Sequence, residues 1–259
     1  MLEITPVPAF ADNYIWILRS PPDRRVAVVD PGDEDPVLEY LSREGLRLGA
    51  ILITHHHGDH TGGIRGLLQA YPGTPVYGPA NERIPAVGER LAEGDCIRPP
   101  GLDQALQVLD VPGHTAGHIA YLGAGALFCG DTLFAAGCGR VFGGTLEDLH
   151  ASLQRIAGLP AETRVYCAHE YTLANLGFAR WVEPESPALE AREASERAKR
   201  ATGLPTLPSR LGDELASNPF LRTSVPEVRR AAEAFAGRPL GREAAVFAAL
   251  RTWKDKEYD

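Results

Sequence analysis

The stretch THHHGDH, at residues 54–60, limits what this chain can fold into more than any other part of the sequence. It follows the apolar run 50–53, which predicts a buried strand that ends at the motif. Four imidazoles and one carboxylate are thus concentrated in a single loop, and these donors suit zinc and also iron or manganese. His55 and His57 are two residues apart, so their side chains project to the same side of an extended chain.

The second half of the motif turns at Gly58, where glycine permits a sharp change of direction. Asp59 and His60 follow directly, so that one turn can face two adjacent metal ions. Three further donors come directly after predicted strands downstream, namely His114, Asp131 and His169. Functional residues gather in loops at strand ends, so this repeated placement predicts a metal site rather than unrelated surface histidines.

The charge of the chain is unevenly distributed. Residues 1–172 carry 12 Lys and Arg against 21 Asp and Glu, a net charge of −9, whereas residues 173–259 carry 14 against 13. An acidic body argues against nucleic acid as a partner, because binding to phosphates requires a basic surface. The C-terminal part can nevertheless supply cations to a small anionic ligand.

The composition is that of a folded protein outside membranes. Of 259 residues, 44% are hydrophobic and 23% are charged, which excludes a disordered chain. No apolar stretch approaches the ~18 residues needed to span a bilayer, and the N-terminus lacks the pattern of a secretory signal. The four cysteines have no CxxC spacing and are interpreted as reduced thiols of a cytoplasmic protein.

Apolar patterns and turn signals predict alternating strands and helices up to residue 172 and helices alone after it, which places a domain boundary there. Residues 35–44 suit a helix that ends at Gly45, and residues 61–71 suit a second helix capped by its threonine. Thr145 is expected to open a helix that reaches residue 157. The helices expected after the boundary cover residues 174–182, 187–202, 226–235 and 242–256.

The succession THxHxDH, GHTxGH and GDT resembles the metallo-β-lactamase superfamily, and the chain is most similar to its hydroxyacylglutathione hydrolase (glyoxalase II) family. The first motif alone indicates only the superfamily, whereas the later stretches indicate the family. Those stretches lie at residues 8–16, 29–33, 130–134, 137–140, 169–172 and 218–222.

The resemblance implies an α+β fold, with an αββα sandwich over residues 1–172 and an all-helical substrate-binding domain over residues 173–259. It also implies two divalent metal ions, with zinc expected first and iron or manganese as alternatives. Asp59 and Asp131 would be catalytic through a metal-bound hydroxide. His55, His57 and His114 would bind one ion, Asp59, His60 and His169 the other, and Asp131 both.

The implied reaction is hydrolysis of S-(2-hydroxyacyl)glutathione, chiefly S-D-lactoylglutathione, to glutathione and D-lactate by a hydroxide that bridges the metals. This reaction serves methylglyoxal detoxification. A small-molecule partner and a monomer are therefore expected. Phe142 stands where some relatives have Tyr, which removes one hydroxyl donor to the ligand. By position in the motifs, Arg140, Tyr171, Arg251 and Lys254 would hold glutathione, whose two carboxylates pair well with cations.

Several alternatives remain open from the residues alone. A lactonase, a β-lactamase or a mono-iron sulfur dioxygenase would share the metal motifs, and a metal-binding module without catalysis is a different class. Covalent catalysis by Cys138 or Cys167 is disfavoured because no histidine base is left over for either. Asp30 and His118 are expected to orient the ligands, His56 to be structural, and His150 to lie at the surface.

Overall fold

The computed structural model describes residues 2–258, whose contacts divide the chain into two compact units. Unit 1 comprises the chain up to Val111 together with Ala116–Gly130. Unit 2 comprises Pro112–Thr115 and the chain from Asp131 onward. The expected α+β class is confirmed, with two sheets in unit 1 and mainly helices in the C-terminal part.

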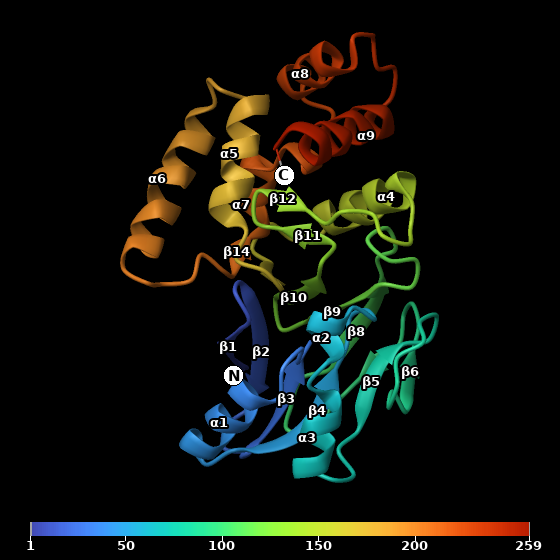
Figure 1. Ribbon diagram of the computed structural model, residues 1–259, viewed down its shortest axis with the longest axis vertical. Coiled ribbons are helices and arrows are strands. Elements are labelled where there is room, and N and C mark those ends of the chain that lie inside the picture. Colours follow the sequence, from blue (N-terminus) through green and yellow to red (C-terminus); the bar gives the residue numbers. More distant parts are fainter. Residues whose placement is uncertain (1, 259) are drawn as a thin grey trace. The chain divides into compact units, whose positions relative to one another are not determined.

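The first sheet lies within unit 1 and has six strands that follow one another in chain order (Figure 1). The first three strands pair antiparallel, whereas β3, β4, β5 and β6 pair parallel. β2 and β3 are rich in buried aliphatic residues, as strands covered on both faces require. The six strands β1 to β6 span Glu3–Ala9, Asn13–Arg19, Arg25–Val29, Arg47–Leu52, Val76–Pro79 and Glu89–Leu91.

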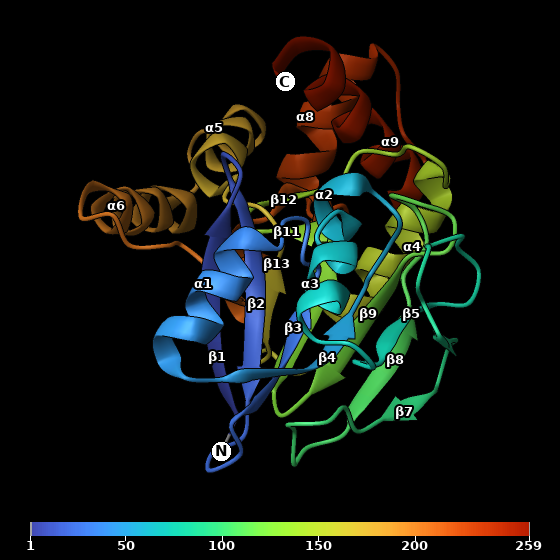
Figure 2. The same ribbon diagram turned by 60° about the horizontal axis from the view of Figure 1, so that its bottom comes forward.

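Helices α1 (Asp35–Glu44) and α3 (Ile64–Ala70) cover one face of this sheet (Figure 2). Ile15 and Ile17 of β2 belong to the same buried cluster as Leu41 of α1. Side chains of alternate strand residues therefore point toward the helices and exclude water from that face.

The prediction for residues 35–44 is confirmed, and the left-handed Gly45 (φ 61°) ends that helix. The prediction of one helix over residues 61–71 is wrong. The short helix α2 (Gly58–Thr61) ends there, and α3 begins only at Ile64. The break lies at Gly62 and Gly63, where an added Cβ would come within 2.6 Å of backbone atoms of the preceding loop. Close approach of two backbone segments thus separates the helices.

The second sheet has six strands, of which the four that belong to unit 1 form an antiparallel meander. Fully buried Tyr121 of β9 donates its hydroxyl to the carbonyl of Ile53, at 2.8 Å. This bond ties the second sheet to the end of β4, where the THHHGDH motif begins. The strands β7 to β10 span Cys96–Ile97, Leu106–Asp110, Ile119–Gly123 and Ala126–Gly130.

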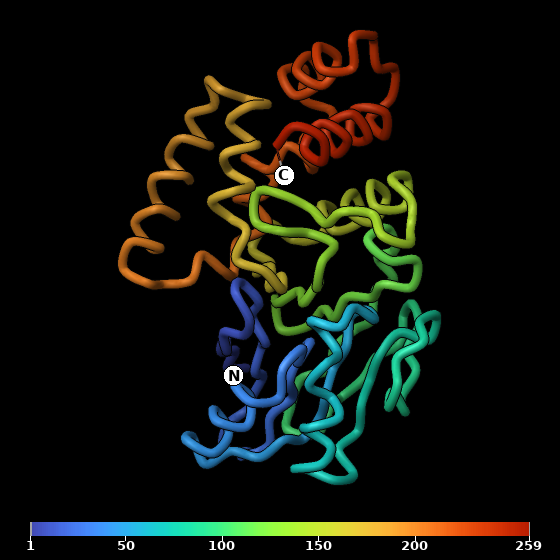
Figure 3. The backbone as a smooth tube through the Cα atoms, in the orientation of Figure 1, coloured from blue at the N-terminus to red at the C-terminus, as the bar shows by residue number. Residues whose placement is uncertain are grey.

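Unit 2 begins with a small hairpin of β11 (Leu133–Phe134) and β12 (Gly137–Cys138). Helix α4 (Leu146–Ala157) then starts as predicted, because the Thr145 side chain accepts a hydrogen bond from the backbone of Asp148. After β13 (Arg164–Cys167), helices α5 and α6 pack side by side, as Figure 3 shows.

The expected C-terminal helices are confirmed, with three additions, namely β14, α7 and the 3-10 helix η1. Ser209–Arg210 forms a two-residue strand, β14, so the expectation of helices alone is corrected at this point. Its pairing with β13 creates it, and so short a strand has no pattern of its own. The seven-residue helix over Leu211–Ser217 was also not predicted from the sequence. The helices are α5 (Thr172–Val182), α6 (Pro187–Ala201), α7 (Leu211–Ser217), η1 (Pro219–Leu221), α8 (Pro226–Ala236), α9 (Glu243–Trp253) and the terminal π-turn η2 (Lys254–Tyr258).

The longest helix, α6, has 15 residues. Within residues 2–258, therefore, no helix reaches the length and apolarity that a membrane span requires.

Candidate metal centre and adjoining pocket

The first half of the THHHGDH motif brings two imidazoles together at the end of β4. His55 is fully buried, and its Nε2 lies 3.0 Å from Nδ1 of His57. The prediction that these side chains project to the same side is confirmed. Two ring nitrogens that face each other so closely suit a shared cation, because each offers a lone pair in its unprotonated form.

The second half of the motif forms α2, and its first turn carries the next two donors. Oδ2 of Asp59 lies 3.5 Å from Nε2 of His60. The amide of Asn13 donates to the same carboxylate oxygen at 3.1 Å and so limits its rotation. The helix itself is closed by Thr61, whose hydroxyl donates to the carbonyl of His57. Residues 55–60 of unit 1 therefore carry two pairs of candidate metal ligands, His55 with His57 and Asp59 with His60.

Buried Asp30 lies behind both pairs. Its Oδ2 is 3.1 Å from Nδ1 of His60 and accepts a 2.7 Å hydrogen bond from the Thr54 hydroxyl. That hydroxyl is in turn 3.1 Å from Nδ1 of His55. A carboxylate beside Nδ1 favours the proton on that nitrogen, so that Nε2 of His60 keeps the lone pair that a metal requires. The expected orienting role is thus supported by a direct contact to His60 and by a link to His55 through the Thr54 hydroxyl.

The remaining histidines of unit 1 differ in their surroundings. Nδ1 of His56 lies 2.7 Å from the buried carboxylate of Glu82, and nearly half of its side chain is exposed. The ring of His118 stacks on that of His55, with centroids 4.6 Å apart and planes inclined by 18°. Its Nδ1 meets the carbonyl of Ile119 at 3.0 Å. His56 therefore anchors the loop, whereas His118 packs against a candidate ligand.

Unit 2 brings its three predicted ligands together. One carboxylate oxygen of Asp131 lies 3.6 Å from Nε2 of His114, and the other lies 3.3 Å from Nε2 of His169. Nδ1 of His114 donates to the carbonyl of Arg140 at 2.7 Å, which leaves its Nε2 with a lone pair. Each oxygen of Asp131 therefore faces a different imidazole, which is the arrangement that a bridging carboxylate needs. The tautomers and donor types in both units fit a divalent transition metal.

Aromatic rings fix the orientation of His169. Its ring stacks on that of Tyr171, with centroids 4.8 Å apart and planes inclined by only 5°. Phe134 meets both rings edge-on, at 5.8 Å from His169 and 5.3 Å from Tyr171. Tyr171 thus packs against a candidate metal ligand while about a third of its surface is exposed.

A pocket of about 500 Å³ lies within unit 2 beside these ligands. Two predicted metal ligands and all four predicted substrate-binding residues belong to its wall. The wall includes the apolar side chains of Phe134, Phe142 and Ala174, and its charged groups are cationic apart from Asp131. The lining residues are His114, Asp131, Phe134, Cys138, Arg140, Phe142, Tyr171, Ala174, Asn175, Arg251 and Lys254.

The cations of the pocket differ in exposure. The side chain of Arg140 is 48% exposed, and its Nε lies 3.5 Å from Oδ1 of Asp255. Lys254 is largely buried, and its ammonium lies 5.7 Å from the centre of the Tyr258 ring. Phe142 is mostly exposed and meets the His114 ring edge-on.

Arg251 differs from the expectation of a cation that only holds a ligand. It is fully buried and donates to the carbonyl of Cys138 at 3.0 Å and to Asp255 at 2.8 Å. Its guanidinium also lies over the Phe220 ring. Asp255 was missed by the sequence reasoning, although its i,i+4 spacing from Arg251 is a signal for such a pair.

The buried thiol in the pocket wall is poorly suited to covalent catalysis. Burial, only partly offset by the charge of Arg251, raises the pKa of Cys138 to about 11. The thiolate is therefore scarce near neutral pH. All four cysteines are free, and Cys96 is the exposed one. The expected inert role of Cys138 is consistent with this environment.

His150 corrects a minor expectation. It is half-buried in α4 rather than at the surface, because its ring packs against Phe247 of α9. The burial lowers the pKa of this histidine.

Comparison with known proteins extends over almost the whole chain. The family model described as the metallo-beta-lactamase superfamily matches residues 10–169, and that described as the hydroxyacylglutathione hydrolase C-terminus matches residues 170–257. The chain is 59% identical to hydroxyacylglutathione hydrolase of Alkalilimnicola ehrlichii, over 99% of this chain and 100% of the relative. It is 52% identical to that of Nitrosomonas eutropha, over 98% and 99%. The crystal structure of TTHA1623 in a di-iron-bound form is 32% identical, with a TM-score of 0.54 over 64% of this chain and 91% of that one.

Proposed function

Because this chain belongs to the hydroxyacylglutathione hydrolase family of the metallo-β-lactamase superfamily, we propose that its main substrate is S-D-lactoylglutathione, which it converts to glutathione and D-lactate. It is a metal-dependent hydrolase of hydroxyacylglutathione thioesters, and its fold carries a divalent metal site. The process that this reaction serves is methylglyoxal detoxification.

One observation supports the proposal most. Arg140, Tyr171, Arg251 and Lys254 line the same pocket as His114 and Asp131. A ligand with carboxylates at one end and a thioester at the other can therefore meet cations and metal ligands at once. The pocket is large enough to hold a small peptide derivative in part, and the apolar side chains of its wall suit the ligand's methylene groups.

For the metals, we propose that the seven predicted ligands hold two ions. Asp131 would bind both ions, and zinc is proposed first, with iron or manganese as alternatives. When bound, two such cations lower the pKa of water from ~15.7 to roughly 7, which makes a hydroxide nucleophile available near neutral pH. His55, His57 and His114 would hold one ion, and Asp59, His60 and His169 the other.

The side chains of the pocket have the remaining roles. Arg140 and Lys254 would pair with the carboxylates of glutathione, and Tyr171 would offer its hydroxyl to the peptide part. Asp30 would keep His60 in the tautomer that binds a cation, through the 3.1 Å contact at Nδ1. No cysteine or serine nucleophile is needed, since the attacking group is water.

The organisation that goes with this function is also proposed. Residues 1–172 would form the catalytic domain and residues 173–259 the substrate-binding domain, and the meeting of the two family models at residues 169 and 170 supports that division. Four free cysteines are consistent with a cytoplasmic enzyme. A monomer would suffice, because unit 2 supplies the pocket wall from a single chain.

The test is a side-by-side assay of purified protein with S-D-lactoylglutathione, a lactone and a β-lactam, together with metal analysis. We expect turnover of the thioester, little or none of the other two, and close to two metal ions per chain. Preference for the lactone or the β-lactam would favour the corresponding alternative hydrolase. A single bound iron with no thioesterase activity would instead favour a sulfur dioxygenase.

A further inference from the structure

We propose that Glu214 and Asn218 are positioning residues, which hold the turn between β11 and β12 and thereby set the places of Asp131 and Arg140. The inference rests on the proposed function, in which Asp131 binds the metals and Arg140 binds the substrate. Neither Glu214 nor Asn218 lines the pocket, so each would act through the hairpin.

The hairpin connects the two functional side chains directly. Asp131 lies two residues before β11 and Arg140 two residues after β12. The ends approach each other closely, because the backbone of Gly139 donates to the carbonyl of Thr132 at 3.2 Å. A Cβ at Gly139 would lie 2.0 Å from the carbonyl oxygen of Asp131. Any shift of the hairpin therefore moves both ends together.

The hairpin has little strength of its own. Each strand has two residues, and the turn places Ala136 at φ 56°, a left-handed conformation that is unfavourable for a residue with a Cβ. Such a conformation persists only where the surroundings determine it. The turn therefore depends on contacts from outside the hairpin.

Glu214 and Asn218 provide those contacts. Nδ2 of Asn218 donates to the carbonyls of Phe134 and Gly137, at 3.2 and 2.9 Å. The backbone N–H of Ala136 donates to Oε2 of Glu214 at 2.8 Å. The same oxygen accepts a hydrogen bond from Asn218 at 3.1 Å. Both side chains are fully buried, so water does not compete for these bonds.

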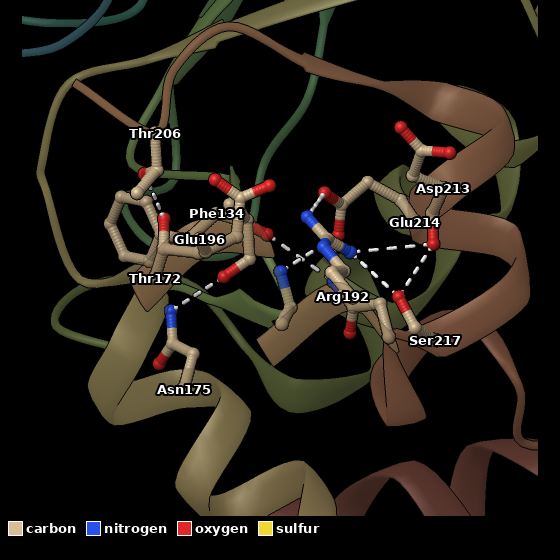
Figure 4. A network of polar contacts seen from close by, with 12 residues as sticks. Phe134, Thr172, Asn175, Arg192, Glu196, Thr206, Asp213, Glu214 and Ser217 are labelled. Carbon is tan, nitrogen blue, oxygen red and sulfur yellow. Dashed lines mark hydrogen bonds and ion pairs between the residues drawn. The ribbon is translucent and has the colours of Figure 1, made fainter. Parts of the chain in front are cut away.

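A third amide completes the support from another helix. Nδ2 of Asn175, on α5, donates to the carbonyl of Ala135 at 3.0 Å, as Figure 4 shows. Together with the preceding bonds, every residue of the turn from Phe134 to Gly137 is thus held through its backbone. Support through backbone groups does not depend on which side chains the turn carries.

A cation neutralises the buried carboxylate. The second oxygen of Glu214 accepts a very short hydrogen bond from Arg192 of α6 (Figure 4). Arg192 also donates to the hydroxyl of Ser217 at 2.7 Å and to the carbonyl of Asp213 at 3.3 Å. An unpaired carboxylate would be costly in this interior, so Arg192 allows Glu214 to accept from the hairpin in its charged form.

These contacts suggest a role for residues 218–222, a stretch that resembles the family but to which the sequence analysis assigned no function. Asn218 also accepts from the backbone of Phe220 at 3.1 Å and so begins the turn η1. The ring of Phe220 then lies beneath the guanidinium of Arg251. One short segment therefore contacts both the hairpin and a pocket cation.

The test separates the hydrogen bond to the hairpin from the ion pair. In a background with Arg192→Leu, Glu214→Gln keeps an oxygen that can accept from Ala136, whereas Glu214→Leu does not. Both variants lose the ion pair alike. We expect the Gln variant to keep kcat, KM and metal affinity near those of the Arg192→Leu background. The Leu variant should lose about tenfold to a hundredfold in kcat, as expected when a reacting group is misplaced, and should raise KM.

Two readouts do not depend on turnover. Amide hydrogen exchange over residues 131–140 should be faster in the Leu variant only, and competition with a chelator should show weaker metal binding. A matched control is Leu41→Ala, because Leu41 belongs to the buried cluster of α1 and the first sheet, and that cluster includes no hairpin residue. It should lower the free energy of unfolding without changing exchange, kcat or KM.

Equal kinetics and equal exchange in the Gln and Leu variants would overturn the proposal, and Glu214 would then be only half of a buried ion pair. The same loss in the Leu41→Ala control would overturn it too, because general destabilisation would explain both. If the wild-type protein fails to hydrolyse the glutathione thioester, the proposed function falls, but exchange and metal affinity still decide the positioning role.

Discussion

The guanidinium of Arg251 donates a 3.0 Å hydrogen bond to the carbonyl oxygen of Cys138, which lies 113 positions earlier in the chain. It also pairs with Asp255 at 2.8 Å. Arg251 thus ties the C-terminal helix α9 to β12 at the same time as it lines the pocket. A change at this position has two consequences, one for ligand binding and one for the stability of unit 2.

Arg251 and Lys254 are therefore expected to respond differently to substitution. Lys254→Ala should raise KM for the glutathione thioester about tenfold with little change in kcat, because a cation far from the breaking bond binds ground and transition states alike. Arg251→Ala should also lower the free energy of unfolding by about 1–3 kcal/mol, since the buried Cys138 carbonyl loses its hydrogen-bond donor. Steady-state kinetics and urea unfolding measure the two effects.

Arg238→Ala is a matched control, because it removes one exposed cation outside the pocket. Its KM should stay at the wild-type value. A small thioester without the tripeptide should show little effect of Lys254→Ala, and added salt should weaken wild-type binding of the full substrate. An unchanged KM in a double substitution of Arg251 and Lys254 would mean that neither residue binds glutathione.

Asp255 is expected to oppose substrate binding. It is an exposed carboxylate among the cations of the pocket and lies 3.5 Å from Arg140. Exposed ion pairs contribute ~1 kcal/mol or less, so Asp255→Asn should cost little stability at the contact with Arg140. Asn also keeps a side-chain oxygen that can accept from buried Arg251, while the substitution removes a charge that competes with the substrate. KM should fall by about two- to fivefold at low ionic strength. A rise in KM would indicate instead that Asp255 holds the cations in place for the substrate.

Asp131→Ala should remove metal and turnover together, because each of its oxygens faces a different imidazole. We expect the wild-type protein to hold about two metal ions per chain and to lose activity on chelation. The variant should hold fewer ions and lose at least about a hundredfold in kcat, the order expected when metal catalysis fails. Elemental analysis and kinetics measure both. Full activity in the variant, or in metal-free protein, contradicts the hydrolytic mechanism.

Cys138→Ala should leave turnover largely intact. Total loss of turnover, with normal folding and metal content, would point to covalent catalysis instead. The variant should also change the dependence of stability on pH. Burial raises the pKa of Cys138 to about 11 from its ordinary value of 9.0, so the stability that the neutral thiol contributes is complete below pH 9 and is lost as pH rises to 11.

The stability advantage of wild type over Cys138→Ala should accordingly shrink by up to about 3 kcal/mol across that interval. Urea unfolding of both proteins at several pH values measures the difference. Iodoacetamide should label exposed Cys96 at pH 8 much faster than Cys138. A constant difference in stability between pH 8 and pH 11 would show that the Cys138 thiol has an ordinary pKa.

Much of the candidate site was predictable because its signals are local. Residues two apart in an extended chain point to the same side, which brings His55 and His57 together. Thr145 marks the start of α4, because its side chain accepts a hydrogen bond from the backbone of Asp148. Motif similarity then supplied the proposed substrate-binding positions, and all four of these residues line one pocket. Residues whose roles depend on their chemical type and their spacing could therefore be predicted from the sequence.

The chain by itself determined the donors for metal, the strands they follow and the family to which they belong, because these depend on residue type and near neighbours. Only the tertiary structure decided that Arg251 is buried against Cys138, that Ser209–Arg210 becomes a strand, and that Glu214 accepts from Ala136. A buried polar group must find a partner wherever the fold places one, often far along the chain. No local pattern marks which of many ordinary polar residues that partner will be.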